Sequence, residues 1–252
     1  MAEQPARGPR KGGAAEPTPA RRASDRGRYG RLSRERVLAS ALTLVDREGL
    51  SALSMRRLGT ELGVEAMALY RYASSKDSLL DGLVEALYLE LEERLAADTG
   101  EDTDWRAGLH RIARATYGVC LTHPQAVPLL ATRLLAVPLA RRPAAVLRDH
   151  ERVLTLLRDA GFGEEATAEV FRAFTAWLLG YVAVELGPTV DNPDETDPAF
   201  RLGLHRLSAK ELPTLRETAA ALAGQGGPEG LAAGLDALLD GFTSGSASAA
   251  SG

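Results

Sequence analysis

Apolar residues recur through most of the chain at the three- and four-residue spacing of α-helices. Near the start, Val37, Ala41, Leu44 and Val45 share one face of a helix that Gly49 ends. No stretch shows the alternation of apolar and polar residues, enriched in β-branched side chains, that is typical of a strand. The spacing therefore predicts an all-α protein.

Several classes of protein are excluded by what the sequence lacks. No apolar run approaches the roughly 20 residues of a membrane span, so no membrane contact is expected. The N-terminal residues lack the apolar segment of a secretory signal. A single cysteine, Cys120, excludes an internal disulfide, and four scattered histidines without HExxH or CxxC spacing offer no metal site. We expect a cytoplasmic protein without metal or cofactor.

Charge is distributed unevenly along the chain. Residues 1–76 contain 15 Lys and Arg against 8 Asp and Glu, whereas residues 77–252 contain 15 against 26. This asymmetry indicates a polyanionic partner for the N-terminal end or, alternatively, a solvated basic tail on an ordinary enzyme. Residues 1–30, rich in Ala, Gly, Pro and Arg, carry too little apolar surface to fold and are expected to form a disordered basic arm.

Capping residues and glycines divide the rest of the chain into helices. Ser54 caps a short helix that Gly63 stops, and Ser74, with Asp77 three residues on, forms a capping box that opens a long helix ending at Leu95. Further helices are expected at Glu65–Tyr72, Trp105–Thr122, Gln125–Leu135, Arg142–Ala160, Glu164–Leu186 and Pro228–Phe242. The expected domains are a three-helix domain at 31–80, a helical bundle at 81–243 and a flexible tail at 244–252.

The segment Ser51–Lys76 has the plan of a helix-turn-helix. Two short helices meet across Gly63, and in this motif the second helix enters the major groove of DNA while the first crosses the phosphate backbone. Apolar residues that would lock the two helices together are Leu58, Leu62, Val64 and Leu69. Small or apolar side chains on the second helix permit close approach to base edges and thymine methyl groups. These are Ala66, Met67 and Ala68.

Other side chains of this segment can reach phosphates. Arg56, Lys76 and the tyrosine hydroxyls would position the helix without reading sequence. Tyr70 and Tyr72 cannot both be core residues, because residues two apart on a helix do not share a face. The alternatives are core packing for Tyr70 and a solvated arginine at a helix start for Arg56.

The run from Leu32 to Leu80 resembles the N-terminal DNA-binding domain of the TetR family of bacterial transcriptional repressors. The likeness lies in an amphipathic helix ending in EGL, then SMRRLGTELGV, then LYRY before a Ser/Lys helix start. The resemblance implies DNA contacts from Arg56, Ala66, Met67, Ala68, Tyr70, Tyr72 and Lys76. Met67 and Ala68 stand where tetracycline-responsive members carry Pro and Thr, so the operator sequence of those members does not carry over.

The chain beyond Trp105 is similar to the tetracycline-repressor type of C-terminal domain. That resemblance implies an all-α domain that binds an inducing small molecule and dimerises through two late helices, here Glu164–Leu186 and Pro228–Phe242. Apolar side chains cover more than half of the first of these, so its second side packs on a partner subunit or, alternatively, in the core of one monomer. Aromatic clustering indicates a ligand cavity or ordinary core packing. The candidate ligand-binding residues are Trp105, Tyr117, Phe171, Phe174, Trp177 and Tyr181.

The same resemblance argues against a magnesium–tetracycline inducer. The magnesium-liganding histidine of tetracycline-binding members falls near Leu130 or Pro138 here, and Glu185 is one residue out of register with the acidic ligand. The effector therefore remains an unidentified small molecule.

An all-α enzyme or small-molecule carrier with a basic tail is the alternative reading. Cys120 has His123 three residues on, but Pro124 ends that helix and no third orienting group is evident, which favours a buried structural thiol. We therefore expect no catalytic activity. The expected protein is a homodimeric repressor of a palindromic double-stranded DNA operator that an effector releases, although a helix-turn-helix dimer without an effector remains open.

Overall fold

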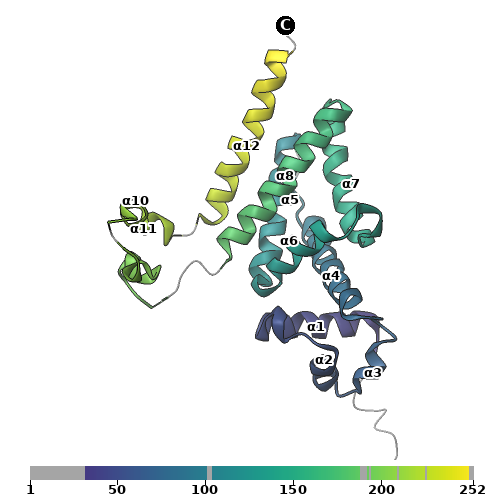
Figure 1. Cartoon of the computed structure of the whole chain (residues 1–252). Helices are drawn as coiled ribbons and strands as arrows, with labels where there is room; N and C mark the ends of the chain where they lie inside the picture. Colours follow the sequence, from purple (N-terminus) through teal and green to yellow (C-terminus); the bar gives the residue numbers. More distant parts are fainter. Residues whose placement is uncertain are drawn as a thin grey trace, which may run out of the picture. The chain divides into compact units, whose positions relative to one another are not determined.

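A computed structural model describes residues 32–100, 104–187, 192, 194–208, 210–224 and 226–249. Over these residues the chain is helical and contains no strand, so the all-α prediction is confirmed (Figure 1). The basic arm predicted at 1–30 lies outside the described residues. None of the described helices is long and apolar enough to cross a membrane.

The N-terminal part, residues 33–80, is called the head here, and residues 81–249 the body. The head contains α1 (Arg34–Glu48), η1 (Leu50–Ala52), α2 (Met55–Leu62), α3 (Ala66–Leu69) and the start of α4 (Lys76–Ala97). The body contains the rest of α4 and α5 (Trp105–Thr122), η2 (Pro124–Ala126), α6 (Val127–Ala136), η3 (Leu139–Arg141), α7 (Ala144–Asp159), α8 (Glu164–Glu185) and α12 (Gly227–Ala249). Both ends of α5 are where the sequence predicts them.

Leucines form the core of the head. Leu58, Leu69 and Leu79, from α2, α3 and α4, have no exposed surface. Leu62 is also buried, whereas Val64 is only half-buried, so three of the four predicted locking residues belong to the core. The predicted face of α1 is buried throughout, and α1 packs against α2 and α4.

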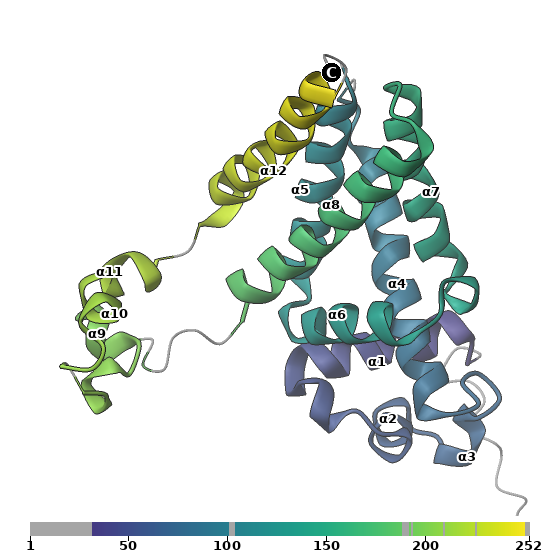
Figure 2. The same ribbon diagram turned by 45° about the horizontal axis from the view of Figure 1, so that its top comes forward.

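Helix α4 connects the head to the body. It packs against α1 on one side and against α5, α6 and α7 on the other (Figure 2). In the body, α8 packs against α6 and α7, and α12 packs against α5 and α8. The inner face of α8 consists of Val170, Phe174, Leu178 and Val182, which recur every four residues and are buried.

The predicted capping box of α4 is wrong. Ser75, and not Ser74, caps the helix by accepting a hydrogen bond from Ser78 N at 3.0 Å. The reason is tertiary, because the Asp77 carboxylate is bonded to Arg133 of α6 at 3.1 Å. The cap predicted for α2 is confirmed, since Ser54 Oγ accepts from Arg57 N at 3.1 Å.

Two further boundaries differ from the sequence expectation. Helix α12 continues to Ala249, so the predicted tail at 244–252 is helical over its first six residues, although four of these six are Ser or Gly, which are weak helix formers. The sequence analysis assigned no structure between residues 199 and 227. There the chain forms α9 (Pro198–Arg201), η4 (Leu204–Arg206), α10 (Pro213–Glu217) and α11 (Ala219–Leu222), which are too short for a periodic signal.

Candidate DNA-binding head and effector cavity

Two glycines set the geometry of α2 and α3. Gly63 ends α2 with φ +66°, a left-handed conformation that side chains with a Cβ rarely adopt. Gly59 lets the following turn approach α2, because a Cβ at this position would lie 2.8 Å from Val64 O and 3.2 Å from Ala66 N. Gly63 is predictable from the sequence as the end of α2, whereas the role of Gly59 depends on how the two helices pack.

Helix α3 presents an exposed face beyond this turn. Met67 is 75% exposed and Tyr70 is 44% exposed, which excludes core packing for both. Ala66, Ala68 and Tyr72 are half-buried. The helix ends at Leu69, earlier than the predicted Tyr72, because Ala73 N and Tyr72 N both donate to Leu69 O and turn the chain.

Two neighbouring arginines of α2 have different surroundings. Arg57 donates to Glu48 at 2.6 Å and to Glu61 at 3.1 Å, and Arg47 bonds to the same two carboxylates at 2.9 Å. Hydrogen bonds from these guanidinium groups lower the pKa of Glu48 and of Glu61. Arg56, by contrast, is exposed and makes no ion pair with any described residue. Its guanidinium is therefore available to a phosphate.

Lys76 is exposed at the first residue of α4, beside the turn that follows α3. It too has no ion pair within the described part of the chain. The structure therefore brings Arg56, Met67, Tyr70 and Lys76 to the surface of one small unit made of α2, α3 and the start of α4. An exposed apolar side chain on α3, together with unpaired cations on the helices before and after it, suits a groove edged by phosphates.

The aromatic residues proposed for ligand binding contact one another in pairs. The ring centroids of Trp105 and Phe162 lie 5.1 Å apart, and those of Tyr117 and Trp177 lie 6.3 and 5.5 Å from that of Tyr181. Elsewhere Phe171 packs edge-on against His150, and Phe174 is buried. None of the six proposed residues, Trp105, Tyr117, Phe171, Phe174, Trp177 and Tyr181, lines either of the two cavities described below, and ligand contact by them stays a prediction.

A narrow internal cavity of about 20 Å³ lies between α4, α5, α6 and α8. Its wall is mostly aliphatic, and three side chains supply polar atoms, namely Tyr88, Thr116 and Cys120. The lining residues are Leu87, Tyr88, Leu91, Thr116, Val119, Cys120, Leu130 and Leu179. Burial raises the pKa of the Tyr88 phenol, which lies in this mainly apolar wall. A hydroxyl at a cavity wall is suited to a ligand with an oxygen function.

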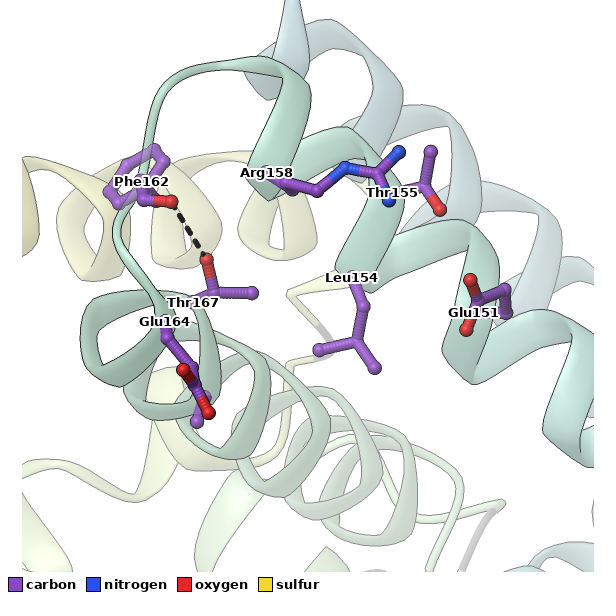
Figure 3. A pocket seen from close by; sticks show the side chains of 8 residues that line it. Glu151, Leu154, Thr155, Arg158, Phe162, Glu164 and Thr167 are labelled. Atoms are coloured by element: carbon purple, nitrogen blue, oxygen red, sulfur yellow. Dashed lines mark hydrogen bonds between the residues drawn. The ribbon is translucent and has the colours of Figure 1, made fainter.

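A larger cavity, of about 390 Å³, lies at the corner between α7 and α8 (Figure 3). Arg158 and Glu164 stand at this corner, where Thr167 Oγ1 donates to Phe162 O at 3.3 Å. The lining residues are Glu151, Leu154, Thr155, Arg158, Phe162, Glu164, Thr167 and Ala168, none of which belongs to α4. A ligand there would not touch the helix that carries the head.

Buried charges flank Tyr88 on the side of α7. Asp149 is 8% exposed, and burial raises its pKa to about 6. Its neighbour His150 accepts from Arg142 at 2.9 Å, and burial, with the adjacent guanidinium, lowers its pKa to about 4. The Asp149 carboxylate is compensated by Arg152, whose Nη1 lies 3.2 Å from Asp149 Oδ1.

Cys120 and His123 do not form a nucleophile–base pair. Burial raises the pKa of the Cys120 thiol to about 12, which is the opposite of activation. Both ring nitrogens of His123 bond to carboxylates, Nδ1 to Asp46 and Nε2 to Glu90, each at 2.8 Å. Within the described residues, groups of His, Cys, Asp and Glu that could hold a metal ion are absent.

Two family models match the chain. The model described as bacterial regulatory proteins, tetR family, matches residues 37–83, and the model described as tetracyclin repressor-like, C-terminal domain, matches residues 98–246. The first range contains the exposed face of α3, and the second contains most of the body.

Curated relatives are transcriptional regulators. The HTH-type transcriptional repressor DrrR1 of Streptomyces coeruleorubidus is 33% identical over 165 residues, which are 66% of this chain and 58% of DrrR1. An HTH-type transcriptional regulator of Saccharopolyspora erythraea is 33% identical over 154 residues, 61% of either chain. The chain thus spans 58% and 61% of the lengths of these two relatives.

A solved structure of a possible TetR family transcriptional regulator from Streptomyces coelicolor A3(2) has the same fold. Its TM-score is 0.66 at 26% identity, with 84% of this chain and 99% of that chain covered. The structure of ActR from Streptomyces coelicolor in complex with (S)-DNPA matches with a TM-score of 0.64 at 25% identity, covering 86% of this chain and 99% of that one.

Proposed function

Because this chain belongs to the TetR family of bacterial regulatory proteins, we propose that it is a dimeric transcriptional repressor that binds a palindromic DNA operator and releases it when a small molecule binds. The observation that carries this proposal is the exposed face of α3. Met67 on α3 is 75% exposed, and the unpaired cations Arg56 and Lys76 are exposed on the preceding and following helices, a combination that serves a base edge and its phosphates. The protein acts in the cytoplasm, where DNA is available, and has no catalytic role.

The DNA contacts divide into two kinds. Met67 and Ala68, with Ala66 beside them, approach base edges, and Tyr70, Tyr72, Arg56 and Lys76 position α3 through phosphates. Two copies of α3 must lie about 34–36 Å apart to enter successive turns of the major groove. A ligand that binds more tightly to a dimer with a different separation lowers operator affinity. The size of the decrease is set by the difference between the ligand's affinities for the operator-binding state and for the altered state.

We assign the effector to the cavity between α4, α5, α6 and α8. A cavity of about 20 Å³ holds little more than one water molecule, so a bound effector must move these helices apart. Leu87, Tyr88 and Leu91 belong to α4, the helix that also carries Lys76. Displacing α4 at the cavity therefore displaces the head. The (S)-DNPA bound to ActR is consistent with a small-molecule effector.

The cavity wall also defines the class of effector. No charged side chain lines it, and transferring an unpaired charge into an apolar interior is costly. The Tyr88 hydroxyl can donate to a carbonyl, and Thr116 Oγ1, which already donates to Ile112 O at 2.9 Å, can accept from a hydroxyl group. The effector is accordingly a mainly apolar, uncharged molecule with one or two oxygen functions.

The dimer forms through α8 and α12. The outer face of α8 carries Ala176, Gly180 and Val184, which recur every four residues and are exposed, with Val184 at 74%. Small side chains along one stripe allow a second helix to approach closely, and a two-fold axis places the same stripe on both subunits. Replacing Val184 by Glu should give a monomer of 26.8 kDa, whereas Leu89→Glu, at an exposed leucine of α4, should remain dimeric.

Selection of duplexes from a random DNA pool tests the function as a whole. The full chain should recover a palindrome whose half-sites are about one helical turn apart. Sedimentation of the same preparation at micromolar concentration reports the subunit number. Recovery of no shared sequence, or binding by a strict monomer, would contradict the proposal.

A further inference from the structure

His123 stands where the head, α4 and the rest of the body meet. It follows the last residue of α5, and its side chain is 12% exposed. Nδ1 lies 2.8 Å from Asp46 Oδ2 in α1, and Nε2 lies 2.8 Å from Glu90 Oε2 in α4. One imidazole ring therefore joins three helices, one of which belongs to the head.

The Asp46 carboxylate depends on this ring. Its second oxygen, Oδ1, is buried without a hydrogen-bond partner, and its first bonds to His123. If the ring moved away, or if the nitrogen that faces Asp46 lost its proton to solvent, α1 would hold a half-buried carboxylate with no compensating charge. Such a group is costly to retain where it is, so the contact between α1 and η2 would open.

Glu90 is held differently. It also accepts from Arg94 at 2.8 Å, and Arg94 in turn donates to Thr122 at 2.7 Å. Although burial raises the pKa of Glu90, the hydrogen bonds from Arg94 and His123 lower it below its usual value. Glu90 therefore stays bound to the body when His123 changes, and the contact that is lost is the one to the head.

We propose that His123 is a protonation-dependent latch that fixes the orientation of the head on the body, so that operator affinity falls when pH is raised and the ring can no longer donate to both carboxylates. This inference rests on the proposed function. Only the doubly protonated ring can donate to Asp46 and Glu90 at once, since neutral imidazole has a single N–H. Histidine is also the side chain that changes charge within the physiological pH range.

The groups that face His123 come from each element packed around it. They are Asp46 from α1, Glu90 and Arg94 from α4, and the buried thiol of Cys120 from α5, whereas η2 contributes no titratable side chain. With the latch open, the head samples more orientations, and ordering both heads on one operator costs binding free energy. His123 is thus a positioning residue that acts on DNA binding through α1.

The experiment compares two histidines that each bond to a carboxylate at 2.8 Å. His110 bonds to Asp236 and joins α5 to α12, away from α1. Affinity for the duplex recovered by selection is measured between pH 6 and pH 8 for the full-length wild type, His123→Gln and His110→Gln. We expect the wild type and His110→Gln to weaken about tenfold across this range, as for one charge-assisted hydrogen bond lost, and His123→Gln to show a flat profile.

Hydrogen exchange at a fixed pH of 6 tests the latch without DNA. Amides of α1 should exchange faster in His123→Gln than in the wild type, while those of α7 should not change. If His123→Gln fails to fold, Asp46→Asn removes the same contact and should reproduce both effects. The latch would be overturned if operator affinity varied with pH in the same way in all three proteins. It would also be overturned if the α1 amides exchanged equally fast in the wild type and in His123→Gln. Absence of DNA binding at every pH, together with the expected exchange, would instead contradict the proposed function.

Discussion

The head and the body place their polar side chains in opposite ways. In the head, Arg56, Tyr70 and Lys76 are exposed around a core of fully buried leucines. In the body, Tyr88, Asp149 and His150 are turned inward, where burial shifts their pKa values. A surface that binds a polyanion keeps its charges in water until the partner arrives. In the interior, Asp149 and His150 are paired with the guanidinium groups of Arg152 and Arg142.

Because of this difference, the head and the body should respond to different solution conditions. The ion pairs of the head are exposed to solvent, and therefore to salt, whereas the buried groups of the body respond to pH and to occupancy of the cavity. Substitutions in the head should change DNA binding with little effect on the body.

Gly59→Ala should unfold the head while the body stays folded. The new Cβ would lie 2.8 Å from Val64 O, a backbone atom that cannot move without opening the turn before α3. We expect a loss of about 1–3 kcal/mol in the stability of the head, together with loss of operator binding. Gly63→Ala is the matched control, because it has open space but φ +66° and should cost about 1 kcal/mol. Hydrogen exchange by helix measures both, and equal effects of the two variants would contradict the packing role of Gly59.

Asp149→Asn should raise the free energy of unfolding above that of the wild type, and by more at pH 7 than at pH 4.5. The folded pKa of about 6 exceeds the ordinary 3.8, so the wild-type carboxyl loses stability as pH rises from about 4 to 6. Removing it should recover on the order of 2 kcal/mol at pH 7.

The neighbouring His150→Gln should have the opposite dependence. Its folded pKa of about 4 lies below the ordinary 6.5, so the wild-type ring loses stability as pH falls from about 6.5 to 4. Denaturant unfolding of both variants at pH 4.5 and 7 measures these effects. If the change in unfolding free energy depended on pH in the same direction for both variants, the two groups would not be buried as described.

Tyr88→Phe should raise the stability of the body by about 1 kcal/mol, because it removes a hydroxyl from a mainly apolar cavity wall, where burial raises the pKa of the phenol. The matched change in the head, Tyr70→Phe, should leave stability unchanged and weaken operator binding, since Tyr70 is 44% exposed. Thermal unfolding and DNA titration of the two variants provide the comparison. A destabilised Tyr88→Phe would mean that the hydroxyl has a partner.

Arg56→Gln should reduce the salt dependence of operator binding by about 0.9 in logarithmic slope, the effect of one lost phosphate contact. Arg57→Gln should leave this slope unchanged, because Arg57 is already bonded to Glu48 and Glu61. The measurement is the operator dissociation constant at several salt concentrations. A slope that changes only in Arg57→Gln would reverse the two roles.

Features determined by nearby residues could be predicted from the sequence. Both ends of α5 follow from Asp104, whose side chain caps it at 2.9 Å, and from Pro124 just beyond it. The buried faces of α1 and α2 follow from helical spacing, and the exposure of Met67 follows from the same periodicity.

Features assembled across the chain could not be predicted in this way. Asp77 bonds to Arg133, which lies 56 residues further on, so Ser75 rather than Ser74 caps α4. The cavity takes its wall from residues between Leu87 and Leu179, and aliphatic side chains in four helices give no local signal. The clustered aromatic residues were the visible feature of this region, yet they pack against one another. The two carboxylate contacts of His123 likewise join residues 77 and 33 positions apart.

The most direct test of the central claim compares a residue expected to contact base edges, Met67, with one expected to contact a phosphate, Lys76. Affinities for the selected operator and for a scrambled duplex are measured at one salt concentration for the wild type, Lys76→Ala and Met67→Gln. Lys76→Ala should weaken both duplexes equally and leave their ratio unchanged, because a phosphate contact carries no sequence information. Met67→Gln should change the ratio, since a base-edge contact contributes roughly 1–3 kcal/mol of discrimination. A ratio that changes with Lys76→Ala and not with Met67→Gln would contradict the account.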